Sequence, residues 1–104
     1  MTDVTPFIDL PGASGALYRF RKIEGLLPPI GGNFVYIREK DGVAQVLGCG
    51  KSRALGRTLA TDMAANGQEG DLYVRLNVAG AKRESEHQDL IAALPEPFTI
   101  YETE

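Results

Sequence analysis

The chain has 104 residues, enough to bury one hydrophobic core and too few for a second, so we expect a single domain over 1–104. Its net charge of −3 argues against strong non-specific binding to nucleic acid, because proteins that neutralise many phosphates are usually basic overall. The one cysteine, Cys49, excludes an internal disulfide and fits a reducing compartment.

Nothing in the sequence predicts export or a membrane span. The N-terminal residues do not carry a basic stretch followed by an apolar one, which is the pattern of a secretion signal. No apolar run approaches the length that a membrane-spanning helix needs. We therefore expect a cytoplasmic protein that does not contact a membrane.

Prolines and glycines divide the N-terminal part of the chain. Residues 1–15 contain two prolines and two glycines, which predict an irregular lead-in. Residues 16–23, ALYRFRKI, alternate loosely between apolar and polar side chains and predict a strand. Residues 25–32, GLLPPIGG, predict a rigid loop.

A β-hairpin is predicted over 33–48. Two apolar runs flank Asp41-Gly42, and an Asp-Gly pair between β-rich runs is a strong hairpin signal. The first run contains Phe-Val-Tyr-Ile without a break, which is typical of a strand buried on both faces.

The apolar period changes to four over 52–65, where Leu55, Leu59 and Met63 share one stripe of a predicted helix. The alternating segment DLYVRLN then predicts a strand over 71–77. A second helix is predicted over 81–94, and FTIYE predicts a final strand over 98–102. These elements are the strand 16–23, the hairpin 33–48, the helix 52–65, the strand 71–77, the helix 81–94 and the strand 98–102.

Because tight hairpins pair antiparallel, we expect a small α/β domain with a mostly antiparallel central sheet. The hairpin 33–48 and the strand 71–77 form this sheet, and the helices 52–65 and 81–94 flank it.

The stretch LGCGKS, residues 47–52, contains the Gly-Lys-Ser that ends a phosphate-binding loop of nucleotide hydrolases. Such a loop needs another glycine five residues before Gly50, where this sequence has Gln45. This mismatch argues strongly against the loop. A weaker anion site remains an alternative, because Gly50-Lys51-Ser52 leads into a predicted helix N-terminus.

Together with its neighbours, the same stretch resembles the GIY-YIG nuclease superfamily. The matching segments are GNFVYIREKDGVAQVLGCGKSRALGRTL (32–59) for the core hairpin and first helix, LYVRLNV (72–78) for the third strand, and RESEHQDLIAALPEP (83–97) for the second helix and its proline-rich exit. The spacing from Gly50 to Leu55, with Lys51 between them, is that of the family. The resemblance covers about residues 16–98 and implies a GIY-YIG-like fold.

The resemblance also implies roles for individual residues. In the family, two tyrosines assist water activation, an arginine stabilises phosphate charge and a glutamate holds one divalent metal. Tyr36 matches the first tyrosine, whereas Gly48 stands in place of the second. The arginine position is Thr58, and Arg57 directly precedes it.

The position of the family's metal-holding glutamate is His87, and Glu86 directly precedes it. The resemblance therefore implies Tyr36 and Arg57 as catalytic residues, Glu86 or His87 as metal ligands, and Mg²⁺ or Mn²⁺ as the cofactor of an active enzyme. Phosphodiester hydrolysis needs such groups, because charge develops on a non-bridging oxygen and on the leaving group.

Each candidate also has a structural interpretation. His87 lies on the apolar face of its helix, as a partly buried, hydrogen-bonded histidine does. Tyr36 in an apolar strand is typical of a core residue with its hydroxyl at the rim. Lys51, Arg53 and Arg57 are typical of a solvated face, and Cys49 of a small buried hydrophobe.

Three functions remain open. The first is a GIY-YIG-like domain with a weakened or inactive site that binds nucleic acid or a phosphorylated small molecule through Gly50, Lys51 and Arg53. The second is a divergent metal-dependent endonuclease acting on DNA or RNA. The third is a protein-interaction domain without a nucleic-acid role, which the net negative charge suits. The missing second tyrosine favours the first and third.

Overall fold

The computed structural model describes residues 7–23, 29–55 and 70–103. These ranges contain six strands and one helix. Along the chain they are β1 (Phe7–Pro11), β2 (Leu17–Lys22), β3 (Gly32–Lys40), β4 (Val43–Ser52), β5 (Asp71–Leu76), α2 (Gly80–Ala93) and β6 (Thr99–Thr103).

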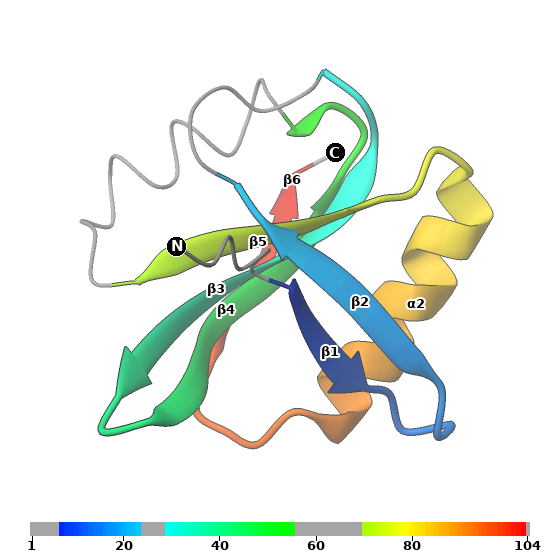
Figure 1. The fold of residues 1–104 in the computed structure, drawn as a ribbon. Helices are drawn as coiled ribbons and strands as arrows, with labels where there is room; N and C mark the ends of the chain where they lie inside the picture. The colour runs from blue at the N-terminus through cyan, green and yellow to red at the C-terminus, as the bar shows by residue number, and fades with distance from the viewer. Residues whose placement is uncertain (1–6, 24–28, 56–69, 104) are drawn as a thin grey trace.

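The strands form one curled sheet in the order β1-β2-β5-β3-β4-β6, and α2 packs on one of its faces (Figure 1). Neighbouring strands are antiparallel, except that β4 and β6 run parallel. The expectation of a mostly antiparallel sheet is confirmed. The class is α+β rather than the expected α/β, because the sheet is built chiefly from antiparallel pairs and not from repeated strand–helix–strand units.

The predicted hairpin is confirmed as β3 and β4. Lys40 pairs with Val43, which leaves Asp41 and Gly42 as the two residues of the turn. Their φ values are 56° and 77°, the left-handed conformation that a type I′ turn requires. The Asp-Gly signal therefore identified the turn correctly.

Three further strands and one helix agree with prediction: 16–23 is β2, 71–77 is β5, 98–102 is β6 and 81–94 is α2.

The irregular lead-in predicted over 1–15 is wrong at Phe7–Pro11, which pair with β2 as strand β1. Pro11 is tolerated there because β1 lies at the edge of the sheet, where a missing N–H need not break a ladder. Ile8 and Leu10 alternate with exposed neighbours, so the strand follows its apolar pattern.

The helix predicted over 52–65 can be compared with the structure only near its start. Ser52 still belongs to β4, where it pairs with Gly32 of β3 and Thr103 of β6. The strand therefore continues past the point where the helix was expected to begin. Residues 56–65 lie outside the described residues.

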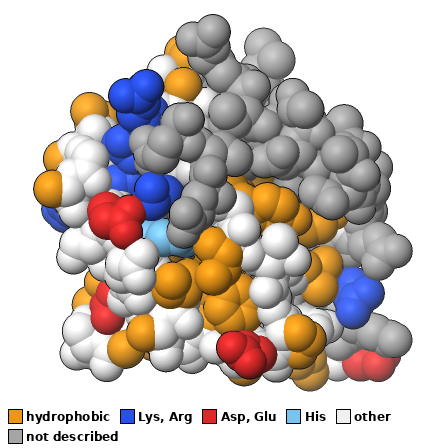
Figure 2. Space-filling model, turned by 180° about the vertical axis from the view of Figure 1, so that it is seen from behind, with side chains coloured by type: hydrophobic (Ala, Val, Ile, Leu, Met, Phe, Trp, Pro, Cys, Tyr) orange, Lys and Arg blue, Asp and Glu red, His pale blue; other side chains and the backbone are white. Residues whose placement is uncertain are grey.

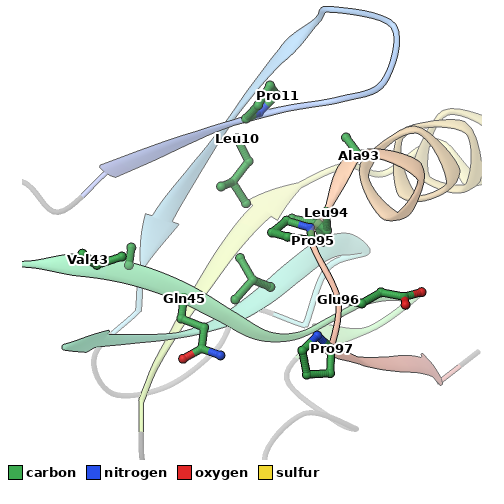
Figure 3. Close-up of a pocket in the computed structure, with 11 residues that line it drawn as sticks. Leu10, Pro11, Val43, Gln45, Ala93, Leu94, Pro95, Glu96 and Pro97 are labelled. Atoms are coloured by element: carbon green, nitrogen blue, oxygen red, sulfur yellow. The ribbon is translucent and has the colours of Figure 1, made fainter.

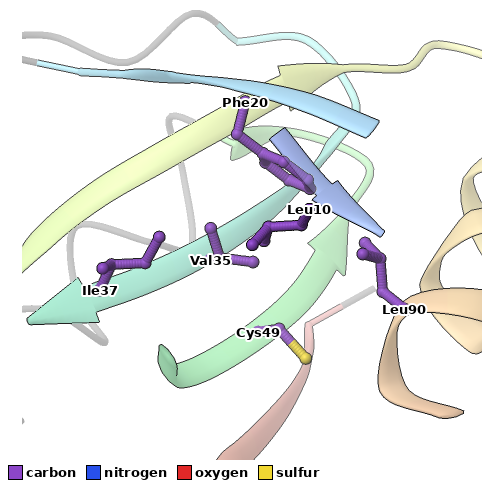
Figure 4. Packing of buried hydrophobic residues seen from close by; sticks show 6 residues of the cluster. All are labelled: Leu10, Phe20, Val35, Ile37, Cys49 and Leu90. Carbon is purple, nitrogen blue, oxygen red and sulfur yellow. The ribbon is translucent and has the colours of Figure 1, made fainter. Parts of the chain in front are cut away.

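The sheet face that α2 covers, here named the helix face, holds the larger apolar cluster (Figure 4). Its buried members are Leu10, Phe20, Val35, Ile37, Cys49 and Leu90. Each large apolar side chain that is fully buried stabilises a fold by about 1.5–3 kcal/mol.

The opposite face, here named the reverse face, has a second cluster of Phe34, Leu55 and Val74, with Tyr101 packed against it. Successive side chains of a strand point to opposite faces. Val35 of β3 belongs to the helix face, so Phe34 and Tyr36 point to the reverse face.

Candidate functional site

Tyr36, which the sequence predicted as a catalytic residue, lies on the reverse face. It is only 6% exposed, and its hydroxyl accepts a hydrogen bond of 2.9 Å from the backbone N–H of Gly70. Glu86 and His87 lie on α2, which packs on the helix face. The sheet therefore separates Tyr36 from both predicted metal ligands.

The two glycines of the second motif fit a close approach by β6. A Cβ on Gly48 would lie 2.6 Å from the ring of Tyr101, and one on Gly50 would lie 2.5 Å from the ring of Phe34 and overlap the carbonyl oxygen of Tyr101. The rings of Phe34 and Tyr101 are 5.9 Å apart. Tyr101, which the sequence analysis did not single out, thus lies against Gly48, the residue predicted to stand in place of the family's second tyrosine.

Polar side chains gather on the helix face below the first two turns of α2. In the sheet register Asn33 of β3 lies between Lys51 of β4 and Arg75 of β5, which places three polar residues in one row. The buried or partly buried residues of this polar cluster are Asn33, Lys51, Arg75, Asn77, Arg83, Glu84 and Glu86.

Glu86 is held inside the polar cluster. Its side chain is 7% exposed, and Oε1 accepts hydrogen bonds from Nε of Arg75 at 2.8 Å and Nδ2 of Asn77 at 3.0 Å. A metal bound through Oε1 would have to displace these donors. The carboxylate therefore acts as the counter-charge of Arg75.

The amides of the polar cluster continue this network. Nδ2 of Asn77 also donates to Oδ1 of Asn33 at 3.0 Å, and Nδ2 of Asn33 donates to the carbonyl of Arg83 at 3.0 Å. Buried polar groups are expensive unless they are paired, and these bonds satisfy them. The network joins β3 and β5 to α2.

The three predicted binding residues differ in how they are presented. Gly50 is buried within β4, and Lys51 donates from Nζ to Oε1 of Glu84 at 3.1 Å. The pKa of Glu84 is lowered by hydrogen bonds from Gln88 and then Lys51. Arg53 alone of the three is exposed. Arg57, the predicted catalytic arginine, lies outside the described residues.

His87 is 1% exposed on the inner side of α2, as its place on the apolar face of the helix predicted. Among the described residues, no three His, Cys, Asp or Glu side chains come close enough together to hold a metal ion. Cys49 is buried, and this burial raises the pKa of its thiol to about 11, so the neutral form that is a poor nucleophile prevails.

The charged side chains of the polar cluster lie near the start of α2. Figure 2 shows the single histidine beside Lys, Arg and acidic side chains on one side of the molecule. Lys51 and Arg75 are paired with Glu84 and Glu86. Arg83 of this cluster is also buried, at 6% exposed, and its Nη1 donates to backbone carbonyls. The described residues supply no carboxylate that pairs with it.

An apolar cavity of about 430 Å³ lies at the opposite end of α2 (Figure 3). Its walls come from the end of β1, the start of β4 and the segment after α2. Leu10, Val43, Leu94 and Pro95 are representative lining residues. Of the predicted site residues that the structure describes, none lines this cavity.

The chain matches no family model, no curated protein and no solved structure. Its likeness to the GIY-YIG superfamily thus stays a prediction from the sequence. Within the described ranges, no helix is both long enough and apolar enough to cross a membrane.

Proposed function

We propose that this chain is a GIY-YIG-like domain without nuclease activity, which binds nucleic acid or another phosphate-bearing ligand. The observation that carries the proposal is the charge arrangement at the start of α2. The acids there are already paired with cations, whereas the described residues supply no counter-charge for a buried arginine, Arg83. Such a site favours holding an anion over hydrolysing one.

Catalysis by the family's mechanism would need a metal held near an activated water. Glu86 is occupied by Arg75 and Asn77, and Tyr36 lies across the sheet from it. The position of the second tyrosine is Gly48. These three features support a domain that retained a ligand surface and not a hydrolytic centre.

Two exposed cations support binding of a polyanion. Arg53 follows β4, and Lys82 lies in the first turn of α2, which contains no acidic residue. Exposed cations attract phosphate backbones through a salt-sensitive interaction. The net negative charge of the chain predicts that this binding is local and weak at physiological salt.

Two assays on one purified protein test the proposal. Plasmid nicking is measured with Mg²⁺ or Mn²⁺, with a chelator as control, and fluorescence anisotropy with labelled DNA and RNA is measured at two salt concentrations. We expect no nicking and binding that weakens as salt rises. Cleavage that follows the protein and stops with chelator would instead establish the divergent endonuclease.

A matched pair of variants locates the surface. Arg53→Ala is expected to weaken oligonucleotide binding, and Arg21→Ala, which removes an exposed arginine from β2, is expected to leave it unchanged. Equal effects of the two variants would mean that only net charge matters. That result would contradict a defined surface at the end of β4.

The apolar cavity favours a second candidate, a protein-interaction domain. Its 430 Å³ are lined almost entirely by apolar side chains, with Gln45 and Glu96 as the polar ones among the described residues. Two results together would favour this candidate. One is no nucleic-acid binding at either salt concentration, and the other is binding of a defined protein partner that Val43→Glu abolishes.

A further inference from the structure

Arg83 is a buried cation whose charge is not neutralised within the described part of the chain. Its Nη1 donates to the carbonyls of Asn77 and Val78, both at 2.9 Å, while Nε has no hydrogen-bond acceptor. Carbonyl oxygens satisfy donors but carry no net charge. A buried guanidinium without a counter-charge is unfavourable, so an anion at this place would stabilise the fold.

The neighbouring acids do not serve this role. Glu84 lies 3.1 Å from Lys51, and Glu86 lies 2.8 Å from Arg75. Each of these carboxylates thus has its own cation. Among the described residues, no carboxylate remains for Arg83, and an external ligand can neutralise its positive charge.

The start of α2 offers backbone donors beside this cation. Ala79 precedes the helix and has no side chain that could cap it. The first helical hydrogen bond runs from the N–H of Arg83 to the carbonyl of Ala79 at 2.9 Å, so the N–H groups of Gly80, Ala81 and Lys82 have no acceptor within the helix. The absence of acid from the first turn keeps the positive end of the helix dipole uncompensated.

The guanidinium and the backbone donors lie next to each other. A Cβ on Gly31 would lie 2.5 Å from Nη1 of Arg83, and one on Gly80 would lie 3.6 Å from Nη2. The guanidinium is thus between the backbone of Gly31 and the first turn of α2. Gly80 and Lys82 are exposed, so a ligand can reach this turn from solvent.

We propose that the N-terminus of α2 and Arg83 together bind one phosphate group. Backbone N–H groups of Gly80 and Ala81 donate to its oxygens, Arg83 neutralises its charge from below, and Lys82 attracts it from the rim. The choice of phosphate over another anion rests on the proposed binding function. A terminal monoester fits best, because it offers three oxygens and up to two charges where a backbone diester offers two oxygens and one.

Three probes test this site on the intact chain. They are inorganic phosphate, a 5′-phosphorylated oligonucleotide and the same oligonucleotide with a 5′-hydroxyl. Amide NMR signals are followed for the first probe, with sodium chloride of equal ionic strength as control, and anisotropy is followed for the other two. We expect phosphate to shift the amides of Gly80 and Ala81, and the 5′-phosphate to tighten binding about tenfold.

The outcomes separate the site from the general function. Equal binding of both oligonucleotides, with no amide shift in phosphate, would overturn the phosphate site and leave nucleic-acid binding in place. Amide shifts without oligonucleotide binding would keep the site and remove nucleic acid as its ligand. Silence of all three probes would overturn both proposals.

A substitution at Lys82 tests the site without disturbing the buried arginine. Lys82→Glu places an acid in the first turn, where it suits the helix dipole, so the melting temperature is expected to stay equal or rise. Phosphate binding is expected to fall about tenfold or more, because the acid repels the anion. Arg21→Glu makes the same charge change on β2 and is expected to leave phosphate binding unchanged. Equal losses in both variants would overturn the site.

Discussion

The two halves of α2 pack against the same sheet through different chemistry. The first half meets the polar cluster, where Glu86 binds Arg75 and Asn77. The second half meets the apolar cluster through Leu90. Apolar contacts tolerate exchange between side chains of similar volume, whereas each buried polar atom requires its own partner. We therefore expect the apolar half to supply most of the stability and the polar half to fix where the helix begins.

The largest expected effect comes from removing the apolar contact. Leu90 is 2% exposed, and Leu90→Ala is expected to lower the free energy of unfolding by about 2–5 kcal/mol, because it leaves a cavity between α2 and the sheet. Denaturation with urea measures the loss. Gln88→Ala, on the exposed side of the same helix, is the control and is expected to change stability by no more than about 0.5 kcal/mol. Similar losses in the two variants would contradict the comparison.

A smaller effect is expected from the polar half. Glu86→Gln keeps the size of the side chain but removes the charge that faces Arg75, and we expect a loss of about 1–3 kcal/mol. Glu84→Gln makes the same change two residues earlier, on a carboxylate whose side chain is about half exposed. Its loss is expected to be much smaller, since solvent screens the pair with Lys51. If the two substitutions prove equally mild under urea denaturation, the polar cluster does not fix the helix.

The smallest expected effect is a pH dependence at the turn between β1 and β2. Asp89 of α2 accepts hydrogen bonds from the backbone N–H of Ser14 at 2.9 Å, from Oγ of Ser14 at 2.7 Å and from the hydroxyl of Tyr18 at 2.7 Å. Hydrogen bonds from Ser14 and then Tyr18 lower the pKa of Asp89, and the bond to Asp89 raises the pKa of Tyr18.

These shifts fix the sign of the pH dependence. A carboxyl whose pKa is lowered by folding adds stability above its unfolded pKa and loses it as pH falls through the folded value. A phenol whose pKa is raised adds stability below its unfolded pKa and loses it as pH rises through the folded value. Unfolding measured from pH 2 to 11 should therefore show acid and alkaline losses, and the acid loss should shrink in Asp89→Asn. An unchanged acid limb in that variant would assign the loss to other carboxylates.

Short sequence signals predicted those parts of the fold that depend on neighbouring residues alone. Asp41-Gly42 fixed the central hairpin because the turn depends on two adjacent residues. β1 was missed because Pro11 and the glycines after it masked the alternation of Ile8 and Leu10. A proline at a sheet edge breaks no ladder, and the position of an edge depends on the whole strand order rather than on the local sequence.

The candidate site was harder to predict, because its members come from distant parts of the chain. Asn33, Lys51 and Arg75 lie in one row only through the pairing of β3 with β4 and β5. His87 was correctly placed on the inner side of α2, whereas the burial of Glu86 was not predicted, because its partners depend on that row. One usable signal was present: each of these three polar residues lies within one residue of the end of its strand.

β6 completes the sheet by lying parallel to β4, and it follows α2 in the chain. During synthesis, β4 must therefore wait for its last neighbour until the helix has left the ribosome. In that interval the nascent protein presents a row of unpaired backbone groups, which another chain can pair with. Because β6 is translated last, we expect the edge of β4 to be the part of the nascent sheet that most needs a chaperone to prevent pairing with other chains.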